Sequence, residues 1–237
     1  MKIFNLFSLF LLIVSSCSFS QKVENVDAKK FKELCDSGKG IILDVRTSGE
    51  YAKGHISNST AISISDRAFE SKINFIQKDK PIYVYCLSGA RSASAAKILL
   101  NNGFKEVYNL QPGILSWQRE GYKLEASNDA LASSAPGLTS DEFNKILKAN
   151  KLVLCDFNAV WCAPCKKMLP IVDKVEKDYK SKINVQKIDI ESSSELAKSY
   201  SVYSVPYFLI FKDGKKVWEK SGITTYEELA GIIKKYQ

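Results

Sequence analysis

Two cysteines spaced three residues apart give the strongest chemical signal in the sequence. Cys162 and Cys165 lie directly between an apolar run that is typical of a strand and a run that is typical of a helix. Unpaired N–H groups and the positive end of the dipole at a helix start stabilise a thiolate over a thiol. We therefore expect Cys162 to be an exposed nucleophile, and Cys165, one turn in, to attack the mixed disulfide that Cys162 forms.

Two other uses of this pair fit the sequence less well. A zinc site needs about four ligands, yet the only histidine, His55, is far away in sequence. A purely structural disulfide is disfavoured because a pair behind Trp161 at a strand-to-helix junction should be exposed. The pair is expected to be a redox dithiol, with no metal and no cofactor.

A further cysteine stands alone at a strand end before a helix. Cys86 opens the loop CLSGAR, in which Gly89 can take backbone conformations closed to other residues. Successive N–H groups of such a loop can curl into an anion-binding nest at the helix start. We expect this nest to stabilise a thiolate on Cys86, or a sulfur anion attached to it.

The remaining cysteines have separate explanations. Cys35 lies on the apolar face of a predicted helix and Cys155 within an apolar strand. Free cysteine behaves as a small hydrophobic residue, so both are expected to fill space in the core. Cys17 belongs to the N-terminal segment.

That N-terminal segment has the layout of an export signal. Lys2 precedes the run IFNLFSLFLLIV, which is too short to span a bilayer as a stable helix and is followed by small residues. The end of the run, Val14-Ser15-Ser16-Cys17, resembles the lipobox of bacterial lipoproteins. The resemblance implies a signal peptide over 1–16, lipid on Cys17, and an extracytoplasmic, membrane-anchored lipoprotein facing the periplasm. Ordinary signal cleavage nearby, with Cys17 free or lost, is the alternative.

Length and composition favour two ordinary globular domains. The chain has 237 residues, of which 45% are hydrophobic and 25% charged. Its net charge of +8 comes from lysines spread along the whole length, and only four of the 34 basic residues are arginine. Nucleic-acid binders concentrate basic residues on one face. We therefore expect no nucleic-acid partner, and at most a mild attraction to anionic lipid.

The elements that must position the cysteines form two different α/β patterns. The first pattern, over 27–125, has a helix capped by Asp27, buried strands at 41–45 and 81–86, and a helix at 92–103 closed by a glycine. The second, over 138–237, has a helix opened by a Thr139/Glu142 capping box, strands at 152–157 and 183–190, a helix at 193–200, strands at 207–211 and 215–220, and a helix at 225–236. We assign a tether to 17–26 and a linker to 126–137.

The second pattern resembles thioredoxin over 138–237. The residues that carry the resemblance are Trp161-Cys162-Ala163-Pro164-Cys165, Asp156, Lys187 and Val205-Pro206. The resemblance implies a mixed sheet, a Cys162/Cys165 redox disulfide, and a buried Asp156, with Lys187 as its neighbour, that takes up the proton of the second cysteine. It also implies a cis-proline loop at Pro206 that faces the dithiol and holds an extended target segment. Ala163, Asn158 and Tyr207 depart from the usual residues and leave the redox potential and target choice open.

The first pattern resembles a rhodanese domain, which implies a parallel sheet with flanking helices. The matching residues are Asp44-Val45-Arg46, Glu50-Tyr51, Gly54-His55-Ile56, Cys86, Arg91, Pro112-Gly113-Ile114, Trp117 and Gly121. The resemblance implies that Cys86 carries a persulfide. The related phosphatases have five residues between cysteine and arginine, whereas four separate Cys86 from Arg91, which favours sulfur over phosphate. His55 is expected to satisfy backbone groups, and Arg46 to pair with an acid such as Glu50.

Both domains would handle sulfur, which leaves three hypotheses. In the first, Cys86 carries sulfane sulfur and the Cys162/Cys165 dithiol reduces it or other disulfides. In the second, the protein is a general disulfide reductase whose N-terminal domain only binds clients, and in the third it is a non-catalytic tethered interaction module. The expected partners are protein disulfides or small sulfane-sulfur donors, an unidentified electron donor, and a membrane reached through the lipid.

Overall fold

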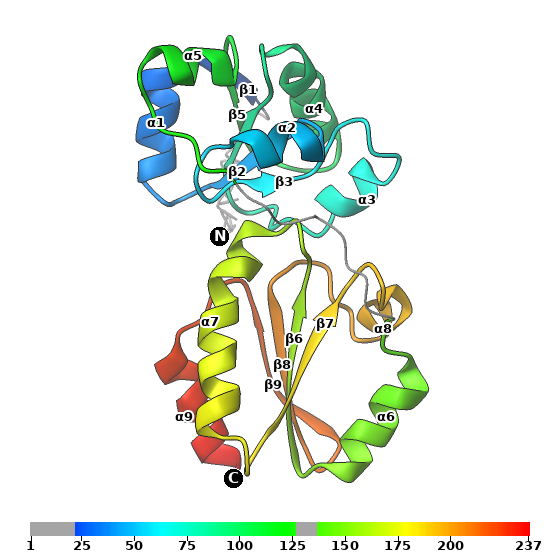
Figure 1. The fold of residues 1–237 in the computed structure, drawn as a ribbon. Helices are drawn as coiled ribbons and strands as arrows, with labels where there is room; N and C mark the ends of the chain where they lie inside the picture. The colour runs from blue at the N-terminus through cyan, green and yellow to red at the C-terminus, as the bar shows by residue number, and fades with distance from the viewer. Residues whose placement is uncertain (1–21, 127–136) are drawn as a thin grey trace, which may run out of the picture.

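The computed structural model describes residues 22–126 and 137–237 as two domains, each built on its own sheet (Figure 1). The predicted signal peptide, the lipidation candidate Cys17 and most of the predicted linker lie outside the described residues. Among the residues that the structure describes, no helix has both the length and the apolar character needed to cross a membrane.

The N-terminal domain has a five-stranded sheet with the strand order β1-β5-β4-β2-β3, and every neighbouring pair is parallel. Its strands are β1 (Lys22–Val26), β2 (Ile41–Asp44), β3 (Thr60–Ala61), β4 (Ile82–Tyr85) and β5 (Glu106–Leu110). Its helices are α1 (Ala28–Asp36), α2 (Ser48–Lys53), α3 (Phe69–Ile73), α4 (Ala90–Asn101) and α5 (Ile114–Arg119). The predicted parallel sheet is confirmed, and α4 begins two residues earlier than expected.

The central strand β4 shows why both faces of this sheet are covered. Tyr83 and Tyr85 pack in a cluster with residues of α1 and α5, whereas Ile82 and Val84 pack in a cluster with residues of α3 and α4. Alternate residues of a strand point to opposite faces, so a continuous apolar run needs helices on both. Because parallel strands end at the same edge of the sheet, Cys86, directly after β4, lies at its carboxyl edge.

Strand β1 lies in the segment that the sequence assigned to the tether. It pairs with β5 from Lys22 to Val26, and the Asn109 side chain donates a hydrogen bond to the Asn25 side chain at 2.8 Å. The tether assignment is wrong for these residues. The sequence KVENV carries only two apolar residues, so its pairing depends on the free edge of β5 rather than on a hydrophobic pattern.

The C-terminal domain has a mixed four-stranded sheet with the order β7-β6-β8-β9, in which β6–β7 is parallel and the other two pairs are antiparallel. Its strands are β6 (Leu152–Asn158), β7 (Asn184–Asp189), β8 (Tyr207–Lys212) and β9 (Lys215–Ser221). Its helices are α6 (Ser140–Ala149), α7 (Ala163–Asp178), α8 (Ser194–Ser199) and α9 (Tyr226–Tyr236). Each of these elements was predicted from the sequence to within a few residues, apart from the exact extent of α7.

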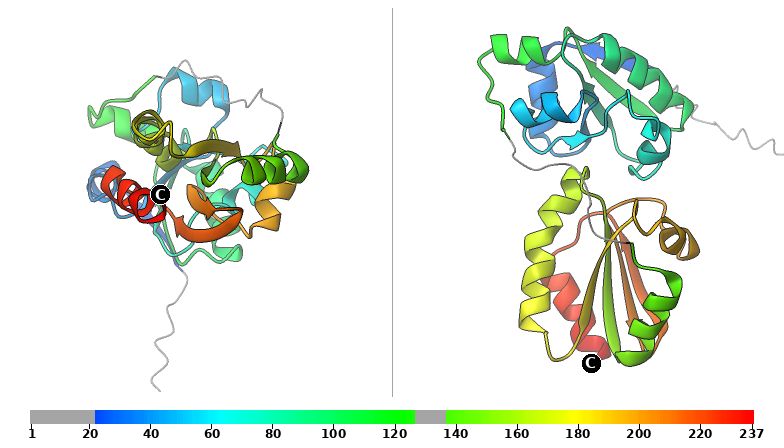
Figure 2. Two further views of the ribbon diagram at one scale, coloured as in Figure 1. Left: turned by 90° about the horizontal axis from the view of Figure 1, so that it is seen from below. Right: turned by 45° about the vertical axis from the view of Figure 1, so that its right-hand side comes forward.

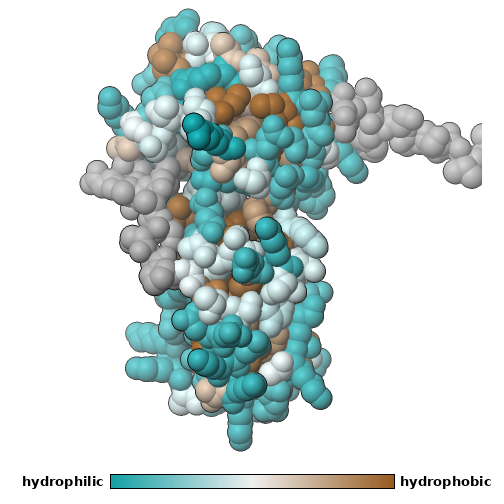
Figure 3. Space-filling view, turned by 90° about the vertical axis from the view of Figure 1, so that its right-hand side faces the viewer, coloured by the Kyte–Doolittle hydropathy of each residue, from teal (hydrophilic) through white to brown (hydrophobic). Residues whose placement is uncertain are grey.

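The two domains meet at the end of the second sheet where α7 begins, as both ribbon views show (Figures 1 and 2). The start of α7, which carries the cysteine pair, therefore lies against the N-terminal domain rather than toward solvent. On the face drawn in Figure 3, hydrophilic side chains cover most of both domains and the apolar patches are small and separate.

Removing β1 should weaken the N-terminal domain. We expect a protein that starts at residue 27 to unfold with a free energy roughly 2–3 kcal/mol lower than one that starts at residue 22, because buried Val26 and several ladder hydrogen bonds are lost. Urea unfolding followed by the fluorescence of the tryptophans checks this. Equal unfolding midpoints for the two proteins would show that β1 contributes no stability.

Candidate functional site

The cysteine pair occupies the junction between β6 and α7 and is closed as a disulfide. Cys162 is the N-cap residue of α7, and the backbone N–H of Cys165 donates to Cys162 Sγ at 3.2 Å. Pro164 stands in the first turn, where its missing N–H would have had no partner within the helix. The helix start thus supplies the N–H that the sequence predicted for stabilising sulfur at Cys162.

The predicted exposure of Cys162 is wrong. Cys162 is only 3% exposed and Trp161 only 4%. Three interdomain hydrogen bonds surround them: Ala61 N–H to Trp161 O at 3.1 Å, Ala163 N–H to Thr60 Oγ1 at 3.3 Å, and Val205 N–H to Phe75 O at 2.9 Å. The prediction treated the C-terminal domain alone, and the surface that covers the disulfide belongs to the other domain.

The proline loop beside the disulfide has the geometry that the resemblance implies. The Val205–Pro206 peptide bond is cis, and Pro206 O accepts a hydrogen bond from Gly222 N–H at 2.8 Å. The one backbone N–H that precedes Pro206, on Val205, points at the N-terminal domain. The backbone position at which the resemblance places an extended target segment is therefore bonded to Phe75 of the same chain.

Asp156 is a buried acid on β6 without a nearby countercharge. Neither of its carboxylate oxygens has a hydrogen-bond partner among the described residues, and burial raises its pKa to about 7. Lys187 stands opposite Asp156 in the β6–β7 register, but its Nζ binds Asp173 at 2.6 Å and Glu176 at 2.8 Å. Lys187 therefore lowers the Asp156 pKa only from a distance, and Asp156 can exchange a proton near neutral pH.

Trp161 connects the site to a charged group at the domain boundary. Its indole N–H donates to Glu191 at 2.8 Å, and Glu191 pairs with Lys72 of the N-terminal domain at 3.0 Å. Lys72 also pairs with Asp66 at 3.0 Å. Lys72 is thus the shared ion-pair partner of Glu191 and Asp66 at the domain boundary.

The loop after β4 forms the nest predicted around Cys86. Gly89 N–H donates to Cys86 Sγ at 3.1 Å, and Ser92 Oγ lies 3.4 Å from the same sulfur. Gly89 has φ +97°, and a Cβ there would collide with the Gln111 side chain. Burial alone would raise the pKa of Cys86, but hydrogen bonds from the Ser92 side chain and from the amides of the loop outweigh it and hold the pKa below its ordinary value.

The arginines near Cys86 are paired differently from what the sequence suggested. Arg91 binds Glu50 through two hydrogen bonds of 2.8 and 2.7 Å, and this pair joins the start of α4 to α2. Arg46, which was expected to pair with Glu50, instead binds Asp44 at 2.6 Å and the carbonyl of Gly54 at 2.7 Å. Asp44 is two residues away along the chain and equally buried, which makes it the closer partner.

His55 and Cys155 behave as expected, whereas Cys35 is only partly buried against the core. His55 Nδ1 lies 3.0 Å from Tyr51 O, and its ring stacks on that of Tyr51. Cys155 is fully buried, and Cys35 is half-buried with its pKa raised to about 12 by burial. Burial raises the pKa of both thiols, so neither cysteine is a nucleophile at neutral pH.

Two exposed leucines flank the Cys86 loop. Leu87, the residue after the cysteine, is 40% exposed, and Leu115 at the start of α5 is 42% exposed. Leu115 N–H donates to Leu87 O at 3.3 Å, so the two side chains come from adjoining backbone. They give the mouth of the nest an apolar rim.

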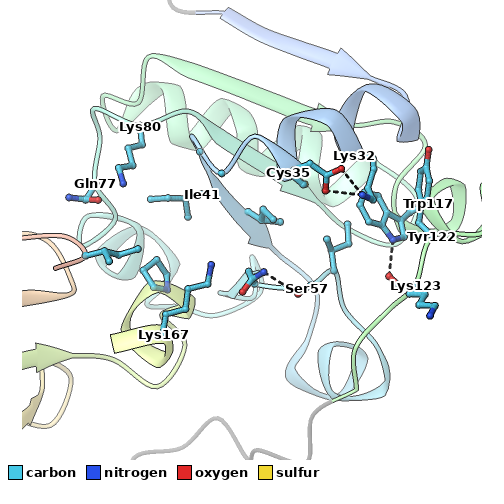
Figure 4. A pocket seen from close by; sticks show the side chains of 18 of the residues that line it. Lys32, Cys35, Ile41, Ser57, Gln77, Lys80, Trp117, Tyr122, Lys123 and Lys167 are labelled. Carbon is cyan, nitrogen blue, oxygen red and sulfur yellow. Dashed lines mark hydrogen bonds and ion pairs between the residues drawn. The ribbon is translucent and has the colours of Figure 1, made fainter. Parts of the chain in front are cut away.

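A cavity of about 590 Å³ opens between the domains on the side of Pro164. Residues of both domains line it, among them Ile41, Ile56, Trp117, Pro164, Lys167 and Ile223. The side chains of Lys80 and Lys167 reach toward it from opposite domains (Figure 4). Within residues 22–126 and 137–237, no group of three or more His, Cys, Asp or Glu side chains is arranged to hold a metal ion.

The two sulfur sites are bonded to different parts of the N-terminal domain. The neighbours of Cys162 bond to β3, whereas the Cys86 loop bonds to the start of α5, where Ile114 N–H donates to Cys86 O at 2.9 Å. Sequence reasoning missed Ser92 and Thr60. Ser92 directly follows Arg91 and could have been found from the loop sequence, whereas nothing local marks Thr60.

Comparisons with known proteins agree with both halves of this description. The family models Rhodanese-like domain and Thioredoxin match residues 27–120 and 135–235. Thioredoxin C-2 of Corynebacterium nephridii is 33% identical over 104 residues, which are 44% of this chain and 96% of the relative. A thioredoxin of Chlamydia trachomatis is 39% identical over 89 residues, covering 38% and 86%. Among solved structures, the N21Q mutant thioredoxin from Halobacterium salinarum matches with 32% identity, a TM-score of 0.39, and coverage of 45% and 96%.

Ser92→Ala should make Cys86 a weaker nucleophile. The serine hydroxyl helps to hold the Cys86 pKa down, so its loss should raise that pKa and slow alkylation near neutral pH about five- to tenfold. The rate is followed on the Cys86 peptide by mass spectrometry across a pH series. Ser94→Ala, on the same helix with its hydroxyl bonded to Ala90 O, is the matched control. Identical pH profiles for both variants would exclude the role of Ser92.

Asp156→Asn should remove a pH dependence of stability. The folded protein keeps a proton on Asp156 up to about pH 7, whereas the unfolded chain loses it near 3.8. As the pH rises from about 4 to 7, wild-type stability should therefore fall by roughly 4 kcal/mol more than that of the variant, and it should stay level above pH 7. Urea unfolding of the oxidised proteins at several pH values measures the difference. A difference that does not vary with pH would contradict the assignment.

Proposed function

Because the chain belongs to the thioredoxin family and also carries a rhodanese-like domain, we propose that it is a thiol–disulfide oxidoreductase that reduces sulfane sulfur held on Cys86 as well as protein disulfides. One observation carries the proposal: Cys86 Sγ and Cys162 Sγ each accept a backbone N–H from a strand-to-helix junction, at 3.1 and 3.2 Å. Each junction stabilises an anionic sulfur, and two such sulfurs on one chain suit a transfer between them.

The proposed transfer is balanced in atoms and electrons. A sulfane donor transfers one sulfur to the Cys86 thiolate, which gives a persulfide. The Cys162 thiolate attacks the outer sulfur of that persulfide, because Cys86 Sγ itself is buried. Cys86 leaves as a thiolate and Cys162 now carries the persulfide. Cys165 then attacks Cys162 Sγ, which expels hydrosulfide and forms the Cys162–Cys165 disulfide. The dithiol is oxidised and the sulfane sulfur is reduced.

Asp156 handles the proton of the second step. Cys165 must lose its proton before it can attack, and Cys165 is buried. A carboxyl group with a pKa of about 7 can accept that proton at neutral pH. This role supports reduction of protein disulfides equally, because the resolving step at Cys165 is the same.

The location we propose comes from the sequence. The apolar run before Val14-Ser15-Ser16-Cys17 supports export and lipid attachment at Cys17, and therefore an extracytoplasmic protein anchored to a membrane and facing the periplasm. Cytosolic reductants are absent there, so an electron donor outside the cytoplasm is needed to regenerate the dithiol.

One observation favours the second hypothesis, a general disulfide reductase. Cys162 is only 3% exposed and its neighbour Ala163 donates to Thr60, so we infer that the domains separate before Cys162 reaches the sulfur on Cys86. The ten-residue segment between 126 and 137 limits the separation of its ends to about 35 Å. A tether of that length keeps the sites at an effective concentration of about a millimolar.

A single-turnover measurement separates the two hypotheses. The protein is reduced, freed of reductant, and mixed with one equivalent of a sulfane donor such as thiosulfate or an organic persulfide. We expect wild type to release one equivalent of sulfide and to end with Cys162 and Cys165 oxidised. Cys162→Ser should instead retain the added sulfur on the Cys86 peptide and release at least about tenfold less sulfide. Cys35→Ser is the control for loss of a cysteine away from both sites.

The opposite result would favour the general reductase. If wild type releases no sulfide and Cys86→Ser reduces insulin disulfides as fast as wild type does, Cys86 takes no part in the reaction. Sulfide release by Cys162→Ser at the wild-type rate would exclude the coupled transfer.

A further inference from the structure

We propose that the N-terminal domain is a redox-dependent occupant of the target groove: it covers the Cys162–Cys165 disulfide and is released when Cys162 becomes a thiolate. The inference rests on the proposed function only in taking the dithiol as redox-active. It concerns which state of the dithiol is open to other proteins.

The first support is the backbone contact at the proline loop. Val205 N–H, directly before cis-Pro206, donates to Phe75 O at 2.9 Å. Backbone pairing of this kind holds an extended peptide in a groove whatever its side chains are. The position that a target segment needs is therefore occupied by residues 73–77 of the same chain.

The second support is the outer edge of β3. Ile62 N–H pairs inward with Asp44 O, whereas Ala61 N–H points outward and donates to Trp161 O at 3.1 Å. An edge strand with a free outward N–H is a template for pairing. Here the active-site loop takes that position, so the edge and the disulfide are covered by one contact.

Side chains complete the closure. Ile62, Ile73 and Ile76 belong to the same continuous cluster of buried apolar residues as Trp161 and Val205. Gln77 donates to Ser221 Oγ at 3.3 Å and packs so tightly on Gly222 that a Cβ there would lie 2.8 Å from its Nε2. The covered surface is apolar at the centre and polar at its rim, as in a specific interface.

The closed arrangement suits a neutral disulfide and not a thiolate. A disulfide carries no charge, so burying it costs little, whereas burying an unpaired thiolate is strongly unfavourable. One N–H at the start of α7, that of Ala163, is already bonded to Thr60 Oγ1. The nearby cation Lys72 is shared by Glu191 and Asp66, so this group carries a net negative charge. A thiolate at Cys162 would gain no counterion from it.

Reduction supplies the charge that drives release. An external dithiol gives two electrons and one proton to the Cys162–Cys165 bond, leaving a thiolate on Cys162 and a thiol on Cys165. The external dithiol becomes a disulfide and its second proton goes to solvent. Release then exposes the groove in the reduced form, which reacts with targets. Re-formation of the disulfide returns the N-terminal domain to the groove, where it displaces the product.

Amide hydrogen exchange measures whether the two domains are in contact, because the interdomain hydrogen bonds use the N–H groups of Ala61 and Val205. In the oxidised protein we expect both amides to be protected. In the reduced protein at mildly alkaline pH their exchange should rise at least about tenfold, while amides of β4 and β6 do not change. Peptide-level exchange followed by mass spectrometry measures this.

Two variants test whether the Cys162 thiolate and the Ala61 hydrogen bond control the contact between the domains. Cys162→Ala cannot form the thiolate, so under reductant its Val205 amide should stay as protected as in the oxidised wild type. Ala61→Pro removes the outward N–H of an edge strand, which tolerates proline, and should raise Val205 exchange even in the oxidised protein. Lys97→Glu, an exposed change on α4, should leave it unaffected.

Two results would overturn the inference. Equal Val205 exchange in oxidised and reduced wild type would show that the domains do not respond to the dithiol. Release of reduced Cys162→Ala to the same degree as wild type would show that the thiolate is not the cause. A protein that shows the expected exchange but neither reduces insulin nor releases sulfide would refute the proposed function and leave the redox-dependent closure standing.

Discussion

The chemistry of this protein depends on backbone N–H groups at the point where a strand gives way to a helix. Cys86 and Cys162 both stand there, and each sulfur accepts one such N–H. The two junctions differ in their second donor. At Cys86 a buried serine, Ser92, adds a hydroxyl and the loop amides add to it, so the pKa of the thiol is held below its ordinary value inside its own domain. At Cys162 the N–H of Ala163 is bonded to Thr60, so the sulfur is suited to the uncharged, disulfide-bonded state.

The two sulfurs are both buried, but by different parts of the molecule. A surface that must bind extended protein segments is apolar around its sulfur, and an apolar surface of that size is unfavourable in water. Trp161 and Val205 provide such a surface, and residues 60–62 and 73–77 cover it. Cys86, which is only 1% exposed, is buried by its own domain, and the exposed side chains of Leu87 and Leu115 flank its loop.

Local sequence patterns predicted most of the fold, because the elements that they predict are stabilised locally. The Thr139/Glu142 capping box and the turn at Asp213-Gly214 each depend on neighbours a few residues apart. Strand β1 could not be predicted in this way, since KVENV pairs with a partner some 84 residues along the chain. The covering of Cys162 was missed for the same reason. Ala61, Phe75 and Lys72 are unremarkable in sequence and become significant only when another domain presents Trp161, Val205 and Glu191 to them.

If one groove serves both the N-terminal domain and external targets, the order of events is constrained. The interdomain hydrogen bonds at β3 and Phe75 do not involve the Cys86 loop, so loading Cys86 with sulfur does not require them to break. Unloading requires Cys162 to leave Thr60, and that occurs only after reduction on the mechanism proposed above. Electrons therefore have to reach the dithiol before sulfur is transferred, and the disulfide left at the end restores the closed state. In this scheme, the negative charge of the Cys162 thiolate, which the closed arrangement does not stabilise, sets the order in which the two sites act.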